Sequence, residues 1–258
     1  MKKKFERINQ LLDIIKSEKN ISVKELAALL EVSEMTIRRD IEVLKDKGYV
    51  NTLYGSVIYT GTTSLNLNDS YHLGDAKDAH NEEKARIGAF AATLVENGDI
   101  LIIDTGSTTE ALVRSLNPDL DITVLCYNHN ILSILLQKPN INLIFSGGYY
   151  HSNTQMFESR EGLSLIKSTR ATKVFISAAG IHKSLGVTCA NNYEIATKHA
   201  IFNSSVDKIL LADSSKFSTV KSSWFAGVED FDMIITDSGI SPEWIEYLQD
   251  LNIPLHVV

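Results

Sequence analysis

Cysteine is scarce in this chain of 258 residues, which has only Cys126 and Cys189. The two lie far apart in the sequence and show none of the spacings typical of a metal site. The seven histidines form no metal-binding pattern either. We therefore predict no metal site and no cofactor, and sparse cysteine usage fits the reducing cytoplasm.

Long hydrophobic runs are also lacking. No apolar stretch approaches the roughly 18 residues that a membrane-spanning helix needs. The N-terminal stretch MKKKFERINQ has no apolar core of the kind found in signal peptides. We therefore expect no membrane segment. Hydrophobic residues still make up 44% of the chain, so a sizeable core and one or two domains are expected.

Positive charge is in short supply as well, with a formal net charge of −7. The charge is unevenly distributed, because residues 1–60 carry 11 Lys+Arg against 9 Asp+Glu, while residues 61–258 carry 14 against 23. With a net charge of only +2, a single copy of residues 1–60 should bind the phosphates of nucleic acid weakly. Tight binding to nucleic acid would need paired domains on two half-sites, so we predict a homo-oligomer.

Residues 22–48 have the pattern of two short helices joined by a tight turn. Ser22 and Glu25 have the spacing of a capping box at the start of the first helix, and Val23, Leu26, Ala27 and Leu30 share one face. Ser33 is placed to cap a second helix that ends near Gly48, with Ile37, Ile41 and Leu44 facing inward. This is the pattern of a helix-turn-helix that binds double-stranded DNA.

The outward residues near the start of the second helix are the predicted DNA-reading residues. In such helices, this end meets the base edges in the major groove. Any small amphipathic helical hairpin shows similar faces, and paired arginines also occur on ordinary solvated surfaces. The predicted set is Ser33, Glu34, Met35, Thr36, Arg38 and Arg39.

Three further segments complete the predicted first half. Apolar residues at helical spacing between Phe5 and Ile15 predict a helix that packs under the other two. Short apolar clusters on either side of Gly55 predict a hairpin, the wing of a winged helix. The polar stretch 61–80 shows neither the hydrophobic period of a helix nor that of a strand. It is predicted to be a linker between a DNA-binding domain, residues 1–60, and a second domain, residues 81–258.

The second domain contains seven short apolar runs separated by stretches long enough for helices. Runs of this length and near-continuous apolar character are typical of strands buried on both faces, as in a parallel sheet covered by helices. We therefore predict an α/β domain with a mostly parallel sheet. The runs are ILIID at 100–104, ITVLC at 122–126, NLIF at 142–145, KVFIS at 173–177, KILLA at 208–212, DMIIT at 232–236 and PLHVV at 254–258.

Small and polar residues follow several of these runs, at the sheet edge where open α/β proteins bind ligands. The segment Asp104-Thr105-Gly106-Ser107-Thr108-Thr109 leads from the first run into a predicted helix. A glycine, hydroxyls and free amides at a helix start form an anion site, although the same residues also suit a plain capped turn. Lys84, Lys198 and Lys216 could bind a phosphate, and Asp104, Glu194 and Asp213 could accept sugar hydroxyls.

Long segments of both parts resemble one family of bacterial regulators. The run AALLEVSEMTIRRDIEVLKDKGYV closely resembles the DNA-binding domain of DeoR-family repressors. EEKARIG, DTGSTT, CYNHN, SGGYYHSN, SAAGIHKSLGVTC, NYEIATKHAI and ADSSKF are similar to the effector domain of the same family. The resemblance implies a winged helix-turn-helix followed by a domain with a fold similar to ribose-5-phosphate isomerase, and a phosphorylated sugar as effector.

Within the family, the similarity is greatest to regulators of deoxyribonucleoside catabolism, on Cys126-Tyr127, Gly147-Gly148 with His151 and Asn153, and residues 177–189. This implies deoxyribose 5-phosphate as effector, with another pentose phosphate as the alternative. Family members usually carry an arginine and a histidine before a Gly-Gly in the wing. Here residues 51–56 read NTLYGS, which leaves a charged wing contact to DNA unsupported.

Positions that match the family's effector domain supply the expected effector contacts. His151 and His182 could also bond sugar hydroxyls. The first choice for effector contacts is Lys84, Asp104, Gly106, Ser107, Thr108, Thr109, Asp213 and Lys216. The second choice is Tyr127, Asn130, Gly148, Gly180, Glu194 and Lys198.

An isomerase-like enzyme acting on a pentose phosphate is the alternative function. Glu194 or Asp213 would be its general base, and Lys216 would polarise a carbonyl. No G-x-S-x-G nucleophile elbow is present. The predicted DNA-binding domain has no evident use in an enzyme, so we favour a repressor. An activator would differ only in where its operator lies.

Overall fold

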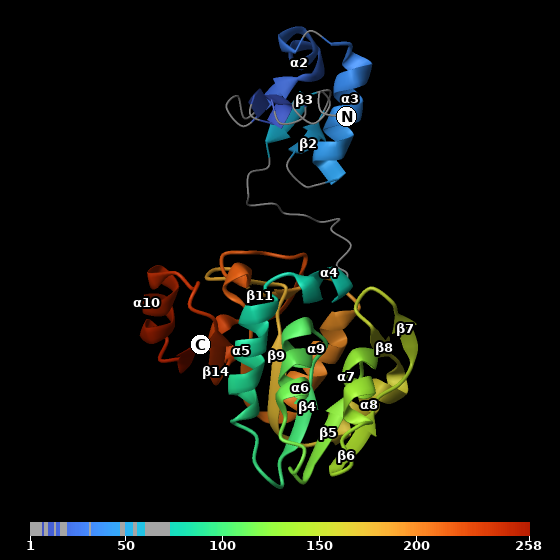
Figure 1. Ribbon diagram of the computed structural model, residues 1–258, viewed down its shortest axis with the longest axis vertical. Coiled ribbons are helices and arrows are strands. Elements are labelled where there is room, and N and C mark those ends of the chain that lie inside the picture. The colour runs from blue at the N-terminus through green and yellow to red at the C-terminus, as the bar shows by residue number, and fades with distance from the viewer. Residues whose placement is uncertain are drawn as a thin grey trace. The chain divides into compact units, whose positions relative to one another are not determined.

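The computed structural model describes residues 73–258 without interruption and, before them, residues 7, 10–12, 14, 15, 20–30, 32–46, 50–53 and 56–59. The chain divides into two compact units, residues 1–69 and residues 70–258 (Figure 1). The predicted linker, residues 61–80, lies outside the described residues as far as residue 72. Its last part instead carries a helix, α4 (Leu73–Asp78).

The first unit contains the predicted helix pair, α2 (Val23–Leu29) and α3 (Glu34–Asp46). The capping box at Ser22 is present, with the Glu25 amide donating to the Ser22 hydroxyl at 3.2 Å and the Ser22 amide donating to the Glu25 carboxylate at 2.9 Å. The inward faces of both helices are buried in one core with Leu11 and Ile15. This agrees with the predicted packing of a preceding helix, whose other residues lie largely outside the described part, as Gly48 does.

The predicted wing is present as the antiparallel pair β2 (Val50–Leu53) and β3 (Ser56–Tyr59). A third strand, β1 (Asn20–Ser22), pairs with β3 and was not predicted. Asp40 is 1% exposed and binds Arg7 across the core, with Arg7 Nε donating to Asp40 Oδ2 at 2.6 Å. The unit is therefore a winged helix-turn-helix.

The second unit is built on a seven-stranded sheet in which every strand pairs in parallel with its neighbours. The spatial order is β15-β14-β12-β9-β4-β5-β6, so the chain moves outward in one direction from β4 and later in the other direction from β9. All seven predicted strands are confirmed. They are β4 (Ile100–Ile103), β5 (Ile122–Cys126), β6 (Ile141–Phe145), β9 (Ala171–Ser177), β12 (Ser205–Leu211), β14 (Met233–Thr236) and β15 (Leu255–Val257).

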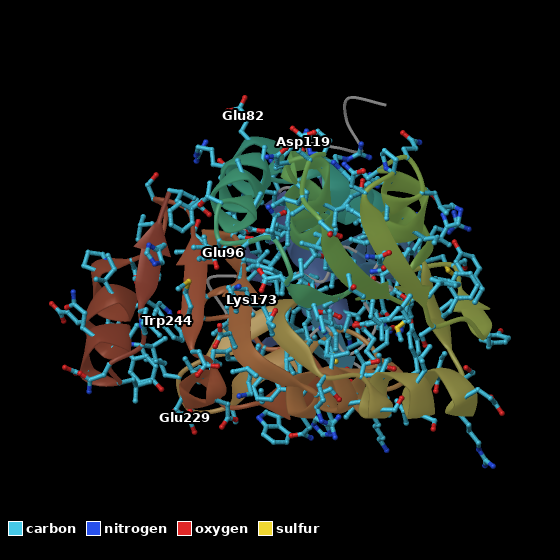
Figure 2. The ribbon with its side chains drawn as sticks, turned by 90° about the horizontal axis from the view of Figure 1, so that it is seen from below. Glu82, Glu96, Asp119, Lys173, Glu229 and Trp244 are labelled. Atoms are coloured by element: carbon cyan, nitrogen blue, oxygen red, sulfur yellow. The ribbon has the colours of Figure 1, made fainter. Side chains whose placement is uncertain are left out.

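Helices cover both faces of this sheet (Figure 2). On one face lie α5 (Asn81–Ala92), α6 (Ser107–Ser115) and α7 (His129–Leu135), and on the other lie α8 (Arg160–Ser168), α9 (Glu194–Asn203) and α10 (Pro242–Asp250). Side chains alternate between the two cores along each strand, as Leu101 and Ile102 do in β4. Burial on both faces explains the near-continuous apolar runs.

Antiparallel strands beside the main sheet were not predicted. β10 (Gly180–His182), β11 (Gly186–Cys189) and β13 (Ser223–Ala226) form a small sheet, and β7 (Tyr149–His151) pairs with β8 (Met156–Glu158). Two single-turn 3₁₀ helices, η1 (Ser214–Lys216) and η2 (Val228–Asp230), complete the unit. We find no helix long and apolar enough to span a membrane in the described parts of the chain.

Candidate functional site

The amino end of α3 carries the predicted DNA-reading residues and is capped as expected. The Ser33 hydroxyl accepts a hydrogen bond from the Thr36 amide at 3.2 Å and lies 2.9 Å from the Thr36 hydroxyl. Ile37, Ile41 and Leu44 are all buried. The cap therefore fixes where the helix begins, and the apolar face fixes which side points outward.

The outward side presents the predicted set to solvent. Ser33, Glu34, Met35, Arg38 and Arg39 are exposed, while Thr36 is half-buried. The Arg38 guanidinium lies 3.8 Å from the Glu34 carboxylate, with both side chains at least half exposed. Such a surface pair contributes little free energy, so Arg38 can exchange it for a base or a phosphate at small cost.

A second candidate site lies at the carboxyl edge of the parallel sheet, where the chain order reverses between β4 and β9. Asp104 follows β4, Ser177 ends β9, Asp213 follows β12 and Tyr127 follows β5. Strands lie about 4.8 Å apart, so these four columns span roughly 15 Å. Open α/β sheets bind their ligands at such a switch point.

Asp104 is the centre of a buried network at this edge. One of its oxygens, Oδ2, accepts hydrogen bonds from Lys198 Nζ at 2.6 Å and from the Ser177 amide at 2.9 Å. The other, Oδ1, accepts one from the Tyr127 hydroxyl. Lys198 also donates to the Ser177 carbonyl at 2.9 Å and lies over the Phe225 ring. We call Asp104, Tyr127, Ser177 and Lys198 the Asp104 network.

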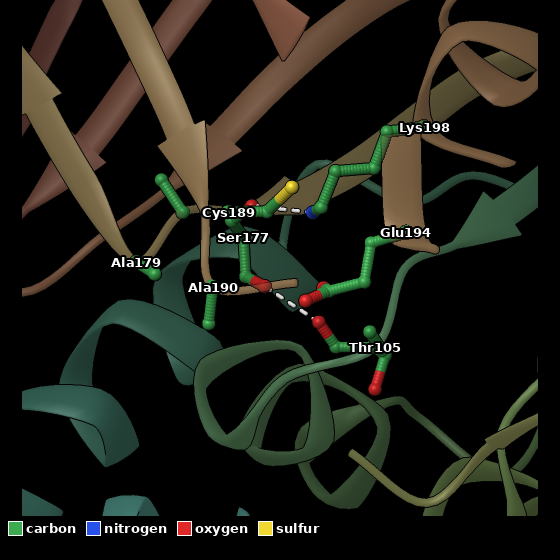
Figure 3. Close-up of a pocket in the computed structure, with 8 residues that line it drawn as sticks. Thr105, Ser177, Ala179, Cys189, Ala190, Glu194 and Lys198 are labelled. Atoms are coloured by element: carbon green, nitrogen blue, oxygen red, sulfur yellow. Dashed lines mark hydrogen bonds between the residues drawn. The ribbon is translucent and has the colours of Figure 1, made fainter. Parts of the chain in front are cut away.

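A pocket opens beside the Asp104 network (Figure 3). Its walls include Thr105, Ser177, Cys189, Glu194 and Lys198. Glu194 Oε1 accepts hydrogen bonds from the amide and side chain of Asn191, at 3.0 and 2.9 Å. In Figure 3 the Glu194 carboxylate points toward Ser177 and Thr105. The pocket therefore offers a carboxylate and hydroxyls to a polar ligand.

Burial and neighbouring charges shift the pKa values of these groups. Burial lowers the pKa of Lys198, but the Asp104 and Glu194 carboxylates outweigh it and the pKa is raised, so Lys198 is a cation. Burial raises the pKa of Glu194, with Lys198 opposing the change. Burial also raises the pKa of Tyr127 well above its ordinary value, and Asp104 adds to the effect. Tyr127 is thus a neutral donor to Asp104.

Asp213 forms the second charged group at this edge, with Lys84 and Lys216. Asp213 Oδ1 accepts hydrogen bonds from the amide and hydroxyl of Ser215. Asp213 Oδ2 lies 3.9 Å from both Lys84 Nζ and Lys216 Nζ, beyond hydrogen-bond distance. Lys84 is 3% exposed, and burial lowers its pKa despite the nearby Asp213. Two cations and one incompletely bonded carboxylate therefore lie together.

The first turn of α6 leads away from Asp104 and combines close packing with free backbone donors. A Cβ on Gly106 would lie 2.5 Å from Ser177 Oγ, so only glycine fits there. The Thr109 hydroxyl donates to the Asp104 carbonyl at 2.8 Å. The first amides of a helix have no partner within it, which leaves those of Ser107 and Thr108 available to an anion.

Buried side-chain atoms without a hydrogen-bond partner gather at the same edge. Within the described residues these atoms are both polar side-chain atoms of Asn128, Asn130 Oδ1, Asp213 Oδ2 and Thr236 Oγ1. Each residue ends a parallel strand or follows one closely, β5, β12 or β14. A buried group left unbonded costs about 1–3 kcal/mol, and such groups are rare in folded proteins.

Asn128 was not among the predicted residues, although it belongs to the CYNHN segment. It is fully buried, and its backbone is extended, with φ −133° and ψ 142°. Side chains alternate along β5, since Cys126 lies in the core under α6 and α7 and Tyr127 in the opposite one. Asn128 therefore faces the side that carries α6. Its position two residues after β5 and its place in the CYNHN segment were the signals in the sequence.

The remaining predicted residues are placed in less direct roles. Asn130 Nδ2 donates to Glu110 in α6 at 2.8 Å, which leaves its oxygen available. Gly148 has φ +150°, and a Cβ there would lie 2.2 Å from the Glu158 carbonyl oxygen. A Cβ on Gly180 would lie 2.6 Å from the Thr219 carbonyl oxygen. Backbone packing accounts for both glycines without a ligand.

The two histidines considered as sugar contacts already have partners. His151 lies 2.9 Å from Glu158 and stacks on Tyr193 at 3.7 Å between ring centroids. His182 Nδ1 accepts hydrogen bonds from the amides of Ser184 and Leu185. Both therefore have structural roles in the β7–β8 and β10–β11 hairpins.

Comparison with known proteins identifies both units. The family described as DeoR-like helix-turn-helix domain matches residues 7–63, and the family described as DeoR C terminal sensor domain matches residues 79–238. The deoxyribose operon repressor of Escherichia coli strain K12 is 34% identical over 250 residues, which cover 97% of each chain. The regulator IolR of Bacillus subtilis strain 168 is 29% identical over 254 residues, 98% of this chain and 99% of that one.

Among solved structures, ribose 5-phosphate isomerase A of Methanocaldococcus jannaschii is similar over 54% of this chain and 55% of that one. The identity is 15% and the TM-score 0.40. A likeness at this level supports no conclusion about chemistry.

Proposed function

Because this chain belongs to the DeoR family of transcriptional regulators, we propose that it represses a sugar or deoxyribonucleoside catabolic operon and that a phosphorylated pentose releases it from its operator. Deoxyribose 5-phosphate is the first candidate for that effector. The deoxyribose operon repressor of E. coli, named for its operon, is 34% identical to this chain. The exposed amino end of α3 is the part that would read operator DNA.

The observation that best supports an effector at the sheet edge is the group of unbonded buried atoms there. Asn128 supplies a donor and an acceptor, while Asn130 and Asp213 each supply an acceptor. Sugar hydroxyls both donate and accept, so they complement such a set. We therefore add Asn128 to the proposed effector contacts.

Charge suggests how a phosphorylated sugar would lie. Lys84 and Lys216 provide two cations on the β12 side, and the free amides of α6 add donors for a phosphate. On the β9 side, the two carboxylates of Asp104 and Glu194 carry more charge than the single ammonium of Lys198, which disfavours a phosphate there. The pocket beside them is lined by groups that can bond sugar hydroxyls. We propose that the phosphate binds near Lys84 and Lys216 and that the hydroxyls face Glu194 and Asn128.

We further propose that the protein acts in the cytoplasm as a homo-oligomer. The small positive balance of the DNA-binding unit favours paired units on two half-sites. Effector binding would then have to stabilise an arrangement in which the paired units no longer match the operator.

The isomerase alternative is set aside. Both matching families describe parts of a transcriptional regulator, and the relatives named above are regulators. The carboxylates and lysines at the sheet edge therefore serve in a regulator and not in an enzyme.

Thermal stability against a panel of sugars tests the proposal. A ligand at 100 times its Kd adds about 2.7 kcal/mol to the stability of the state that binds it. We expect deoxyribose 5-phosphate to raise the melting temperature and free deoxyribose to leave it unchanged. Loss of the shift in Lys216→Ala, with DNA binding intact, would support the proposed phosphate position. If no phosphorylated sugar in the panel raised the melting temperature, the proposal would be contradicted.

A further inference from the structure

The carboxyl end of α4 is held by a residue of the proposed effector site. Lys84 Nζ donates hydrogen bonds to the backbone carbonyls of Ala76 and Ala79. Asp213 Oδ2, at 3.9 Å, is too distant for a hydrogen bond. The buried Lys84 ammonium has three N–H donors, and two of them bond to uncharged carbonyls at the end of this helix.

The amino end of α4 is held from the opposite side of the site. The Leu73 amide donates to the Asn153 carbonyl at 2.7 Å, and the Leu73 side chain is 1% exposed. Asn153 Oδ1 accepts a hydrogen bond from the Tyr193 hydroxyl at 2.8 Å, and Asn153 Nδ2 lies 3.4 Å from Asn191 Oδ1. Asn191 in turn holds Glu194. Both ends of α4 therefore depend on residues that the effector would contact or adjoin.

Alone, α4 has little means of staying folded. It has six residues, fewer than an isolated helix needs in water, and it includes Gly74. Its two anchors and the burial of Leu73 must supply its stability. Among the described residues, α4 is the first element of the second unit, and residues 60–72 separate it in the sequence from β3 of the DNA-binding unit.

We propose that α4 is a latch that Lys84 holds closed in the absence of effector and that the effector's phosphate opens. This inference rests on the proposed function. A phosphate near Lys84 and Lys216 offers Lys84 an acceptor that is itself charged, and an ammonium binds such an acceptor more strongly than a neutral carbonyl. When Lys84 turns to the phosphate, Ala76 and Ala79 lose their donor and α4 loosens. The sensor unit then no longer fixes α4, the described element nearest in sequence to the DNA-binding unit.

The coupling must act in both directions. If effector binding opens the latch and the latch favours DNA binding, then opening the latch by mutation must weaken DNA binding and strengthen effector binding by related factors. A purely structural role for α4 predicts a different pattern, in which damage to it weakens both.

Hydrogen–deuterium exchange on the full-length protein tests the proposal. The probe is whichever of deoxyribose 5-phosphate, ribose 5-phosphate and glucose 6-phosphate raises the melting temperature most. We expect peptides covering residues 73–80 to exchange faster with the probe bound, while peptides of β4 and β12 exchange more slowly or at the same rate. Slower or unchanged exchange at residues 73–80 in the bound state would overturn the latch. If none of the three sugar phosphates raised the melting temperature, the proposed function would fail first.

A variant pair provides the second test. Leu73→Ala should loosen α4 without touching an effector contact, and Leu248→Ala removes an equally buried leucine from α10. We expect Leu73→Ala to bind operator DNA at least fivefold more weakly without effector and to bind the sugar phosphate at least fivefold more tightly. Leu248→Ala should lower the melting temperature and change neither affinity. Weaker effector binding by Leu73→Ala, or unchanged affinities, would overturn the proposal.

Discussion

Lys198 Nζ lies 2.6 Å from Asp104 Oδ2, and the two side chains are 2% and 0% exposed. The pair joins α9, which covers one face of the sheet, to the end of β4, next to the end of its neighbour β9. Tyr127 and the Ser177 amide complete the bonds of the Asp104 carboxylate. This buried ion pair therefore fixes the strand ends that form the floor of the proposed effector site.

Removing one member of this pair should destabilise the sensor unit strongly. Lys198→Met leaves an uncompensated buried carboxylate, which costs about 3–5 kcal/mol. The double variant Asp104→Asn with Lys198→Met should cost clearly less than the sum of the two single changes, because it also removes the Asp104 charge that Lys198 neutralises. Urea unfolding at pH 7 measures both, and strictly additive costs would contradict a coupled pair.

A second ion pair, between the buried Asp99 and the partly buried Lys173 at the opposite edge of the sheet, should make stability depend on pH. Asp99 accepts hydrogen bonds from Lys173 at 2.7 and 2.8 Å and from the Thr172 hydroxyl at 2.7 Å (Lys173 is labelled in Figure 2). Burial alone raises the pKa of Asp99, but Lys173, the Glu96 amide and Thr172 outweigh it and the pKa is lowered.

Because the pKa of Asp99 is lower in the folded state, its ionised form stabilises the protein at pH values above 3.8, the ordinary pKa of an aspartate. This contribution disappears as the pH falls through the folded-state pKa. We expect Asp99→Asn to cost about 1.5–3 kcal/mol at pH 7. The difference from the unchanged protein should shrink below pH 3.8 in urea unfolding. An equal difference at pH 7 and pH 3 would show that charge is not its cause.

Replacing Asn128 by leucine should separate stability from ligand binding. The change removes two unbonded buried atoms, so the free energy of unfolding should stay the same or rise. Binding of the sugar phosphate should weaken at least tenfold, which calorimetric titration can measure. Thr236→Val is the matched control, because it also removes an unbonded buried atom but lies at the end of β14, farther from the switch point. Intact binding by Asn128→Leu would exclude Asn128 from the effector contacts.

Arg39→Ala should weaken operator binding without affecting the sensor unit. A good base contact is worth about 1–3 kcal/mol, so we expect a loss between about fivefold and 150-fold. Arg160→Ala removes an exposed arginine from α8 and serves as the control. Both variants should keep the thermal shift with the sugar phosphate. Loss of that shift in Arg39→Ala would mean that Arg39 supports folding instead of reading DNA.

Strong local patterns explain why much of the fold was predictable. The seven parallel strands are buried on both faces, so each appears in the sequence as a nearly continuous apolar run. The α2–α3 pair carries capping residues, Ser22 and Ser33, whose bonds are made within four residues of sequence. Local signals of this kind do not depend on the rest of the chain.

What the sequence did not reveal depends on contacts between distant residues. Strands such as β7 and β10 have three residues of mixed polarity and exist because a partner strand lies beside them. Helix α4, read as a linker, has six residues, and Lys84 and Asn153 hold it from elsewhere in the chain. That the side chain of Asn128 lacks hydrogen-bond partners likewise depends on the residues around it and cannot be seen in its own segment.

Operator release measured by fluorescence anisotropy tests the central claim most directly. The full-length protein is bound to a labelled DNA fragment from upstream of its own operon and titrated with deoxyribose 5-phosphate, and free deoxyribose is the control. We predict that the phosphorylated sugar lowers DNA affinity at least tenfold and that the free sugar has no effect. Release by another phosphorylated pentose alone would change only the identity of the effector. Unchanged DNA affinity with every phosphorylated sugar would contradict a repressor governed by a sugar phosphate.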